Sequence, residues 1–158
     1  MGSAPWRIMP TFFVAVRAAG GGVTAAYLIQ GVVMLAVAAG VAWVWRNPAA
    51  PLASRGTVLI LGILLFTPYE FYYDLAILAL ALGWLWEEGR RRGRLPGELV
   101  LLLSGWLLPA VALIVYKSSN LSHGHLQIGP VILAALFLLS LRKASAAISE
   151  NPSCRCIG

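Results

Sequence analysis

The sequence predicts an all-α, polytopic membrane protein of about five passes, including a short broken hairpin, with an interfacial helix at its N-terminus. Of its 158 residues, 59% are hydrophobic and 11% are charged, whereas a soluble domain carries about 25% charged residues. With so few charges, the chain cannot cover a globule with a polar surface. The basic residues occur in short clusters between apolar runs, which is typical of membrane proteins and argues against a nucleic-acid partner.

The first helices are predicted from the lengths of the apolar runs. Residues 9–19 are too few to cross a membrane and include Arg17, so we expect an interfacial or re-entrant helix there. Residues 23–45 would form a helix about 34 Å long, enough to cross a hydrocarbon core of about 30 Å. Within this span, Ala36 and Gly40 lie on one face, a pattern typical of close helix packing.

Residues 57–86 allow two interpretations. One straight helix over this stretch would be about 45 Å long, too long for a single pass, and two complete passes need more residues than are present. Pro68 interrupts the middle of the stretch. The chain therefore forms either one long kinked helix or two short helices that meet at residues 67–74.

The remaining passes are predicted over residues 98–116 and 126–141, joined by a polar loop over residues 117–125. This assignment gives one transmembrane domain over residues 1–142. A polar cytoplasmic tail is expected over residues 143–158.

Loop charge favours the hairpin over the kinked helix. With the hairpin, nine of the twelve Lys and Arg residues fall on one side and three on the other, whereas a single helix would place the cluster at residues 90–94 on the side opposite Arg46 and Arg55. The nine are Arg46, Arg55, Arg90, Arg91, Arg92, Arg94, Arg142, Lys143 and Arg155, and the three are Arg7, Arg17 and Lys117. The positive-inside rule then predicts a bacterial-type plasma membrane protein with an extracytoplasmic N-terminus and a cytoplasmic C-terminus.

The hairpin places a cluster of chemistry-bearing residues on the extracytoplasmic side. Glu70 and Asp74 are carboxylates beside a break in the membrane region, where such groups suggest function. They could act on sugar hydroxyls or hold a divalent metal ion, while Tyr69, Tyr72 and Tyr73 stack on a sugar. The structural alternative is that Asp74 caps the following helix and the tyrosines belong to an aromatic belt.

Four basic or imidazole side chains are further candidates on the same side. His123 and His125 could bind phosphate or a metal, but two loop histidines without a third ligand usually face water. Arg7 and Arg17 flank the interfacial helix and could bind a phosphate group, or could extend to lipid headgroups.

Several of these motifs together resemble a known family. Residues 6–13, Tyr27 with Gln30, Thr-Pro-Tyr at 67–69 and Tyr-Asp-Leu at 73–75 are similar to the C-terminal part of glycosyltransferase family 87. The family comprises polytopic enzymes similar to polyprenol-phosphate-mannose-dependent mannosyltransferases. The resemblance implies hexosyl transfer from a polyprenyl-phosphate sugar donor on the extracytoplasmic face.

The resemblance also implies what else the activity requires. Many family members have an aspartate where this chain has Tyr72, and the family's catalytic aspartate lies in an upstream half that is not found here. We therefore expect a truncated enzyme, or the second half of a split enzyme whose partner chain carries that aspartate. Asp74, and after it Glu70, are the candidate bases of the present chain.

Two other functions are compatible with the same residues. The chain could be a non-enzymatic helical membrane module or a decayed remnant, in which these residues are only caps and belt aromatics. A small transporter is a third possibility, but the sequence contains no internal repeat that supports it.

Overall fold

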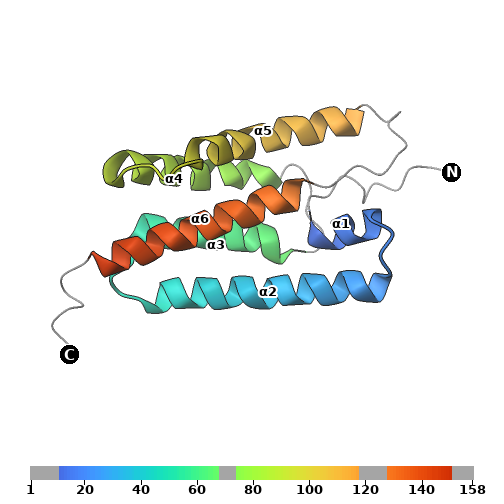
Figure 1. Cartoon of the computed structure of the whole chain (residues 1–158), viewed down its shortest axis with the longest axis horizontal. Coiled ribbons are helices and arrows are strands. Elements are labelled where there is room, and N and C mark those ends of the chain that lie inside the picture. The colour runs from blue at the N-terminus through green and yellow to red at the C-terminus, as the bar shows by residue number, and fades with distance from the viewer. Residues whose placement is uncertain (1–10, 68–73, 118–127, 151–158) are drawn as a thin grey trace.

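A computed structural model describes residues 11–67, 74–117 and 128–150, and every regular element in these ranges is a helix (Figure 1). In chain order the elements are α1 (Phe12–Ala18), α2 (Val23–Arg46), α3 (Leu52–Phe66), the 3-10 helix η2 (Asp74–Ile77), α4 (Leu78–Arg92), α5 (Glu98–Lys117) and α6 (Gly129–Ser149). The all-α prediction is confirmed for the described part of the chain.

The early helices begin where the sequence predicts. Thr11 is the N-cap of α1, and its side chain accepts a hydrogen bond from the Val14 N–H at 3.3 Å. A turn with Gly20 at positive φ (87°) then reverses the chain into α2. The predicted span over residues 23–45 matches α2 to within one residue at its C-terminal end.

The stretch that allowed two interpretations forms two helices, α3 and α4, that lie side by side. The Ser54 hydroxyl near the start of α3 donates to Glu88 Oε1 near the end of α4 at 3.2 Å. The two helices are therefore antiparallel, which excludes one long kinked helix.

The last helix extends further than the sequence predicts. We expected it to end at Leu141 and a polar tail to follow, but α6 continues to Ser149. Lys143, Ala144 and Ala147 are buried in this added part. A helix end at residue 141 is therefore wrong, because the amphipathic continuation packs against the bundle and Lys143 has a buried acidic partner.

The core lies around α3, which packs against α2, α4 and α6 (Figure 1). α5 covers α4 and α6, and α1 packs on α2. The core side chains are mainly leucines, among them Leu61, Leu78, Leu82, Leu133 and Leu136, all of which are almost completely buried. Their burial supplies the main stabilising term between the helices.

Glycines allow two of the helix contacts. A Cβ at Gly40 of α2 would lie 3.1 Å from the ring of Phe137 on α6, so Gly40 marks a helix contact, whereas Ala36 of the same small-residue pattern is exposed. A Cβ at Gly56 of α3 would lie 2.4 Å from the Trp84 ring of α4, which would have to move.

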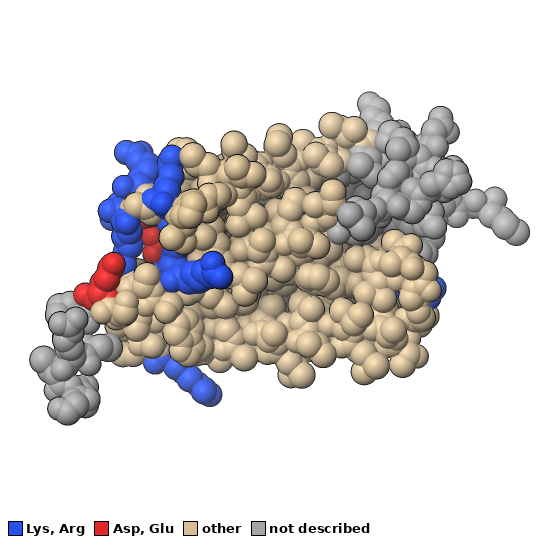
Figure 2. Space-filling view, viewed as in Figure 1, with Lys and Arg blue, Asp and Glu red and all other residues tan. Residues whose placement is uncertain are grey.

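On the face in view, the described surface between the two ends of the bundle carries no charged side chains (Figure 2). Leu28, Val32 and Leu35 of α2 are 67–74% exposed. By length and composition, α2 and α6 could each cross a membrane, and only 17% of the most apolar stretch of α2 is buried. α3, at 15 residues, and the apolar part of α5 (Glu98–Val111) are shorter.

Candidate functional site

The polar side chains of the described residues gather at two opposite ends of the bundle. One end, here called the arginine end, contains the reversals between α2 and α3 and between α4 and α5, together with the C-terminal part of α6 (Figures 1 and 2). The other end, here called the Gln30 end, contains α1, the end of α3 and the start of η2.

Asp74, the first candidate base, is the first residue of η2. This position agrees with the predicted helix start. Most of the other predicted site residues lie outside the described residues: Glu70, Tyr69, Tyr72, Tyr73, Arg7, His123 and His125. Whether they surround Asp74 as expected is therefore still a prediction.

Arg17 is the one predicted phosphate ligand within the described residues. It lies in the last turn of α1, and its Nη1 donates to the Gly21 carbonyl oxygen at 3.0 Å. A cation here is favoured by the dipole of the helix C-terminus. The contact ties Arg17 to the turn before α2 and leaves its other guanidinium N–H groups available to a ligand.

Gln30 forms the most buried polar contact of this end. Its side chain is 1% exposed. Its Oε1 accepts a hydrogen bond from the Phe13 N–H at 3.2 Å, and its Nε2 donates to the Leu65 carbonyl oxygen at 3.1 Å. One amide therefore joins α1, α2 and α3. The sequence showed a polar residue in an otherwise apolar span, which is the signal for such a contact, but could not identify its partners.

An aromatic contact accompanies this junction. The rings of Phe13 on α1 and Tyr27 on α2 have centroids 4.8 Å apart and are inclined by 52°. Such tilted pairs contribute about 0.5–1.5 kcal/mol beyond the area they bury. The contact adds a side-chain link between α1 and α2 one turn before Gln30.

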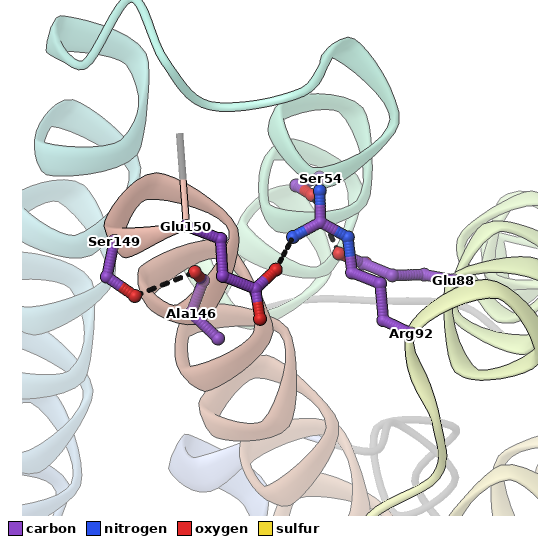
Figure 3. A network of polar contacts seen from close by, with 6 residues as sticks. All are labelled: Ser54, Glu88, Arg92, Ala146, Ser149 and Glu150. Carbon is purple, nitrogen blue, oxygen red and sulfur yellow. Dashed lines mark hydrogen bonds and ion pairs between the residues drawn. The ribbon is translucent and has the colours of Figure 1, made fainter. Parts of the chain in front are cut away.

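The arginine end brings together positive residues from four helices. Figure 2 shows basic side chains gathered at this end. By their positions in the chain, the arginines of this end are Arg46, Arg55, Arg90, Arg91, Arg92, Arg94 and Arg142. Figure 3 shows Arg92 of α4 reaching Glu150 of α6, with Nη1 and Oε2 3.0 Å apart, beside the Ser54–Glu88 hydrogen bond. Arg94 lies over the Trp86 ring at 4.1 Å, within cation–π range.

Glu87, near the end of α4, pairs with an arginine of the same helix. Its Oε1 accepts a hydrogen bond from Arg91 Nε at 2.8 Å, one turn further along α4. This hydrogen bond, with the charges of Arg91 and Arg90, lowers the pKa of Glu87 below its ordinary value. Both groups are exposed, so the pair contributes little to stability.

A second acid of this end is buried. Glu98 at the start of α5 has a side-chain exposure of 0%, and its Oε1 lies 2.9 Å from Lys143 Nζ of α6, which is 7% exposed. Among the described residues, Oε1 accepts no hydrogen bond of good geometry, so the charge of Lys143 is its compensation. Oε2 accepts from the Leu95 N–H at 2.8 Å, which holds the turn that precedes α5.

Sequence reasoning assigned Lys143 to a tail and gave Glu98 no role. An acid in the first turn of a helix was the available signal for the hydrogen bond that Glu98 accepts from the Leu95 N–H. The ion pair could not be inferred, because its two residues lie in different helices.

The described residues contain no group of three or more His, Cys, Asp or Glu side chains that could hold a metal ion. His123, His125 and Glu70 lie outside the described ranges. A divalent metal at the Gln30 end is therefore neither supported nor contradicted by the described side chains.

Comparisons of the chain with protein-family models, with curated proteins and with solved structures found no match. The resemblance to glycosyltransferase family 87 rests on the sequence motifs. Among the residues of those motifs, Phe13 contacts both Tyr27 and Gln30, and this contact lies at the same end of the bundle as Asp74.

Proposed function

We propose that the chain is a plasma membrane protein of the bacterial type that crosses the membrane five times, with α2 to α6 as the passes. The observation that carries this proposal is the separation of charge between the two ends. The antiparallel order of the helices brings arginines from α2, α3, α4 and α6 to one end (Figure 2). The positive-inside rule then makes the arginine end cytoplasmic and the Gln30 end extracytoplasmic.

Tryptophans support the same orientation. Trp43, Trp45 and Trp86 lie 41–46% exposed near the arginine end, where indole rings prefer the membrane interface. The arginines beside them would contact anionic lipid headgroups. Membrane lipids are thus the first partner that we propose.

On the extracytoplasmic face we propose hexosyl transfer, with mannose as the implied sugar, from a polyprenyl-phosphate donor. Support comes from the family-like motifs at residues 67–69 and 73–75 and from the position of Asp74 at the end opposite the arginines. Among the described residues, the four glutamates all lie at the arginine end, so Asp74 is the acid of the Gln30 end.

In the proposed reaction, Asp74 or Glu70 takes the proton of the acceptor hydroxyl. The acceptor oxygen forms a bond to the anomeric carbon of the sugar, and the bond from that carbon to the phosphate oxygen breaks. The polyprenyl phosphate leaves with the bonding electrons, and Arg7 and Arg17 would balance its charge. Tyr69, Tyr72, Tyr73, His123 and His125 would contact the sugar and phosphate.

A further part of the enzyme belongs to this proposal. The resemblance places another aspartate and most of the active-site walls in a different half of the family fold. We therefore propose that the five helices act together with such a half, whether it is carried by a partner chain or by the same polypeptide.

A non-enzymatic membrane module is the alternative. It is favoured by the position of Asp74 at the start of a helix, where an aspartate is a preferred capping residue. The polar contacts described at both ends join helices to one another, as they would in a purely structural bundle.

A transfer assay separates the two functions. The purified chain in lipid nanodiscs would be given a short-chain polyprenyl phosphomannose with a labelled sugar, with and without a candidate partner chain. Transfer that Asp74→Asn abolishes, and that the control Glu150→Gln at the other end preserves, supports the enzyme. Absence of transfer under both conditions supports the module, and transfer unchanged in Asp74→Asn assigns Asp74 to capping.

Cysteine labelling tests the orientation. In a background with Cys154→Ser and Cys156→Ser, Ser119→Cys would be labelled by an impermeant maleimide in intact cells. Ser145→Cys, on the exposed side of α6 at the arginine end, would be labelled only after the cells are opened. The reverse pattern would overturn the proposed topology.

A further inference from the structure

The carboxamide of Gln30 serves two helix ends at once. Phe13 lies in the first turn of α1, where backbone N–H groups have no partner within the helix. Leu65 lies in the last turn of α3, where backbone carbonyl groups have no partner within the helix. The side chain of Gln30 in α2 accepts a hydrogen bond from the Phe13 N–H and donates one to the Leu65 carbonyl oxygen.

These two helix ends need such a partner because the surroundings are apolar. Water can satisfy a helix end at a membrane surface, but within the hydrocarbon every backbone polar group has to be satisfied by protein. Gln30 and Leu65 are closed to solvent, at 1% and 5% exposure, and the hydrogen bond from Phe13 to Gln30 is partly buried. At such a depth a side chain of a neighbouring helix can provide the hydrogen bond that a helix end requires.

With the first residues of α2 and α3 at the two surfaces of the proposed topology, two helix lengths place the junction below the membrane surface. Gln30 lies seven residues beyond Val23, the first residue of α2, which is about 10 Å along the helix. α3 has 15 residues, about 22 Å, and falls about 8 Å short of a hydrocarbon core of about 30 Å. The end of α3 and the start of α1 therefore lie at the same depth.

We propose that Gln30 is a positioning residue that holds the start of α1 and the end of α3 below the extracytoplasmic surface. α1 is then a re-entrant helix that rises from this depth to the Gly20 turn. The end of α3 lies at the same level. The depth and the side of the junction rest on the proposed five-pass topology, and any effect on a lipid-linked donor rests on the proposed sugar transfer, whereas the two hydrogen bonds of Gln30 rest on neither.

Amide hydrogen exchange in nanodiscs, measured by NMR, tests the positioning. Gln30→Met keeps the size of the side chain and removes both hydrogen bonds. We expect at least tenfold faster exchange at Phe13, whose N–H loses its acceptor, and at Thr67, whose N–H bonds to Ile63 O in the last turn of α3. The control Thr24→Val, on the exposed face of α2, should leave both rates unchanged. Unchanged exchange in Gln30→Met would overturn the proposal.

A milder variant covers the case in which Gln30→Met does not fold. Gln30→Asn keeps the amide but is one methylene shorter, so it cannot reach both helix ends. We expect faster exchange at Phe13 or at Thr67. Unchanged rates at both residues would overturn the two-ended role.

Depth can be measured directly with spin labels. A label on Thr67→Cys should show greater collision with oxygen and less with a water-soluble nickel complex than a label on Val23→Cys, at the start of α2. Equal accessibility at the two positions would contradict a junction below the surface.

Failure of the positioning and failure of the proposed function give different results. If Gln30→Met changes the exchange rates while the wild type transfers no sugar, the positioning stands and the enzymatic proposal fails. If the wild type is active and Gln30→Met alters neither exchange nor the KM for the donor, the positioning fails and the enzyme stands. Gln30→Asn should raise the KM less than Gln30→Met.

Discussion

Lys143 on α6 and Glu98 on α5 form an ion pair that is closed to solvent, with Nζ and Oε1 2.9 Å apart. The carboxylate also lies against Gly89 of α4, where an added Cβ would be 2.6 Å from Oε1. Three helices thus meet at one buried charge. Because each charge is removed from water, each depends on the other far more than in an exposed pair.

Removing the lysine should destabilise the bundle strongly. Lys143→Met leaves Glu98 buried without a counter-charge, and we expect a loss of about 3–5 kcal/mol in the free energy of unfolding. Denaturant titration in detergent micelles, followed by tryptophan fluorescence, would measure it. The control is Arg142→Met, an exposed neighbour on the same helix.

The double variant Lys143→Met with Glu98→Gln tests the cause. It removes both charges and keeps an acceptor for the Leu95 N–H, so most of the stability should return. A double variant as unstable as Lys143→Met would show that packing, and not the unpaired charge, is responsible.

The pair between Arg92 and Glu150 should matter much less. Its side chains are 37% and 68% exposed, and exposed pairs contribute about 0–1 kcal/mol. We expect Glu150→Gln to change the free energy of unfolding by less than about 1 kcal/mol, in the same titration. A loss of stability as large as that of Lys143→Met would contradict the expectation that a buried ion pair contributes more than an exposed one.

Two glycines in the hairpin should respond in opposite directions to alanine. Gly56→Ala forces the Trp84 ring away from α3, with an expected cost of about 1–3 kcal/mol. Gly83→Ala on α4 meets nothing within 4 Å and should stabilise the helix by about 0.5–1 kcal/mol. Thermal unfolding by circular dichroism compares them, and a destabilised Gly83→Ala would contradict the packing described for α4.

The arginines at the end of α4 should determine orientation. Replacing Arg90, Arg91, Arg92 and Arg94 by glutamine lowers the positive residues of that side from nine to five, against three on the other. We expect a mixed orientation, seen as partial labelling of Ser145→Cys from outside intact cells. The same four positions changed to lysine should keep one orientation. A single orientation in the glutamine variant would show that other features decide the topology.

Much of the fold follows from patterns that neighbouring residues share. The apolar run that begins at Val23 and ends at Arg46 predicts α2 because its length and its flanks are local properties. Pro68 and the loop charges predicted the reversal between α3 and α4, and the structure confirms that these are two antiparallel helices. The predicted end of the last helix at residue 141 was wrong, because a basic residue at position 143 is typical of a polar tail.

The candidate site could be predicted only in part. Asp74 was expected at a helix start, and it is the first residue of η2. The residues expected around it, Glu70 and the three tyrosines, lie outside the described ranges, so their arrangement stays a prediction. Gln30 was visible as part of a motif, but its hydrogen bonds to Phe13 and Leu65 join residues far apart along the chain.

The sequence by itself determined that this is a helical chain with an apolar middle and one strongly basic side, because hydropathy and charge are properties of each segment alone. Only the tertiary structure decided that Lys143 is buried against Glu98 and that Gln30 joins three helices. A buried polar group is satisfied by whatever partner the packing brings within about 3 Å. Which partner that is depends on how whole helices are placed, and no local pattern specifies it.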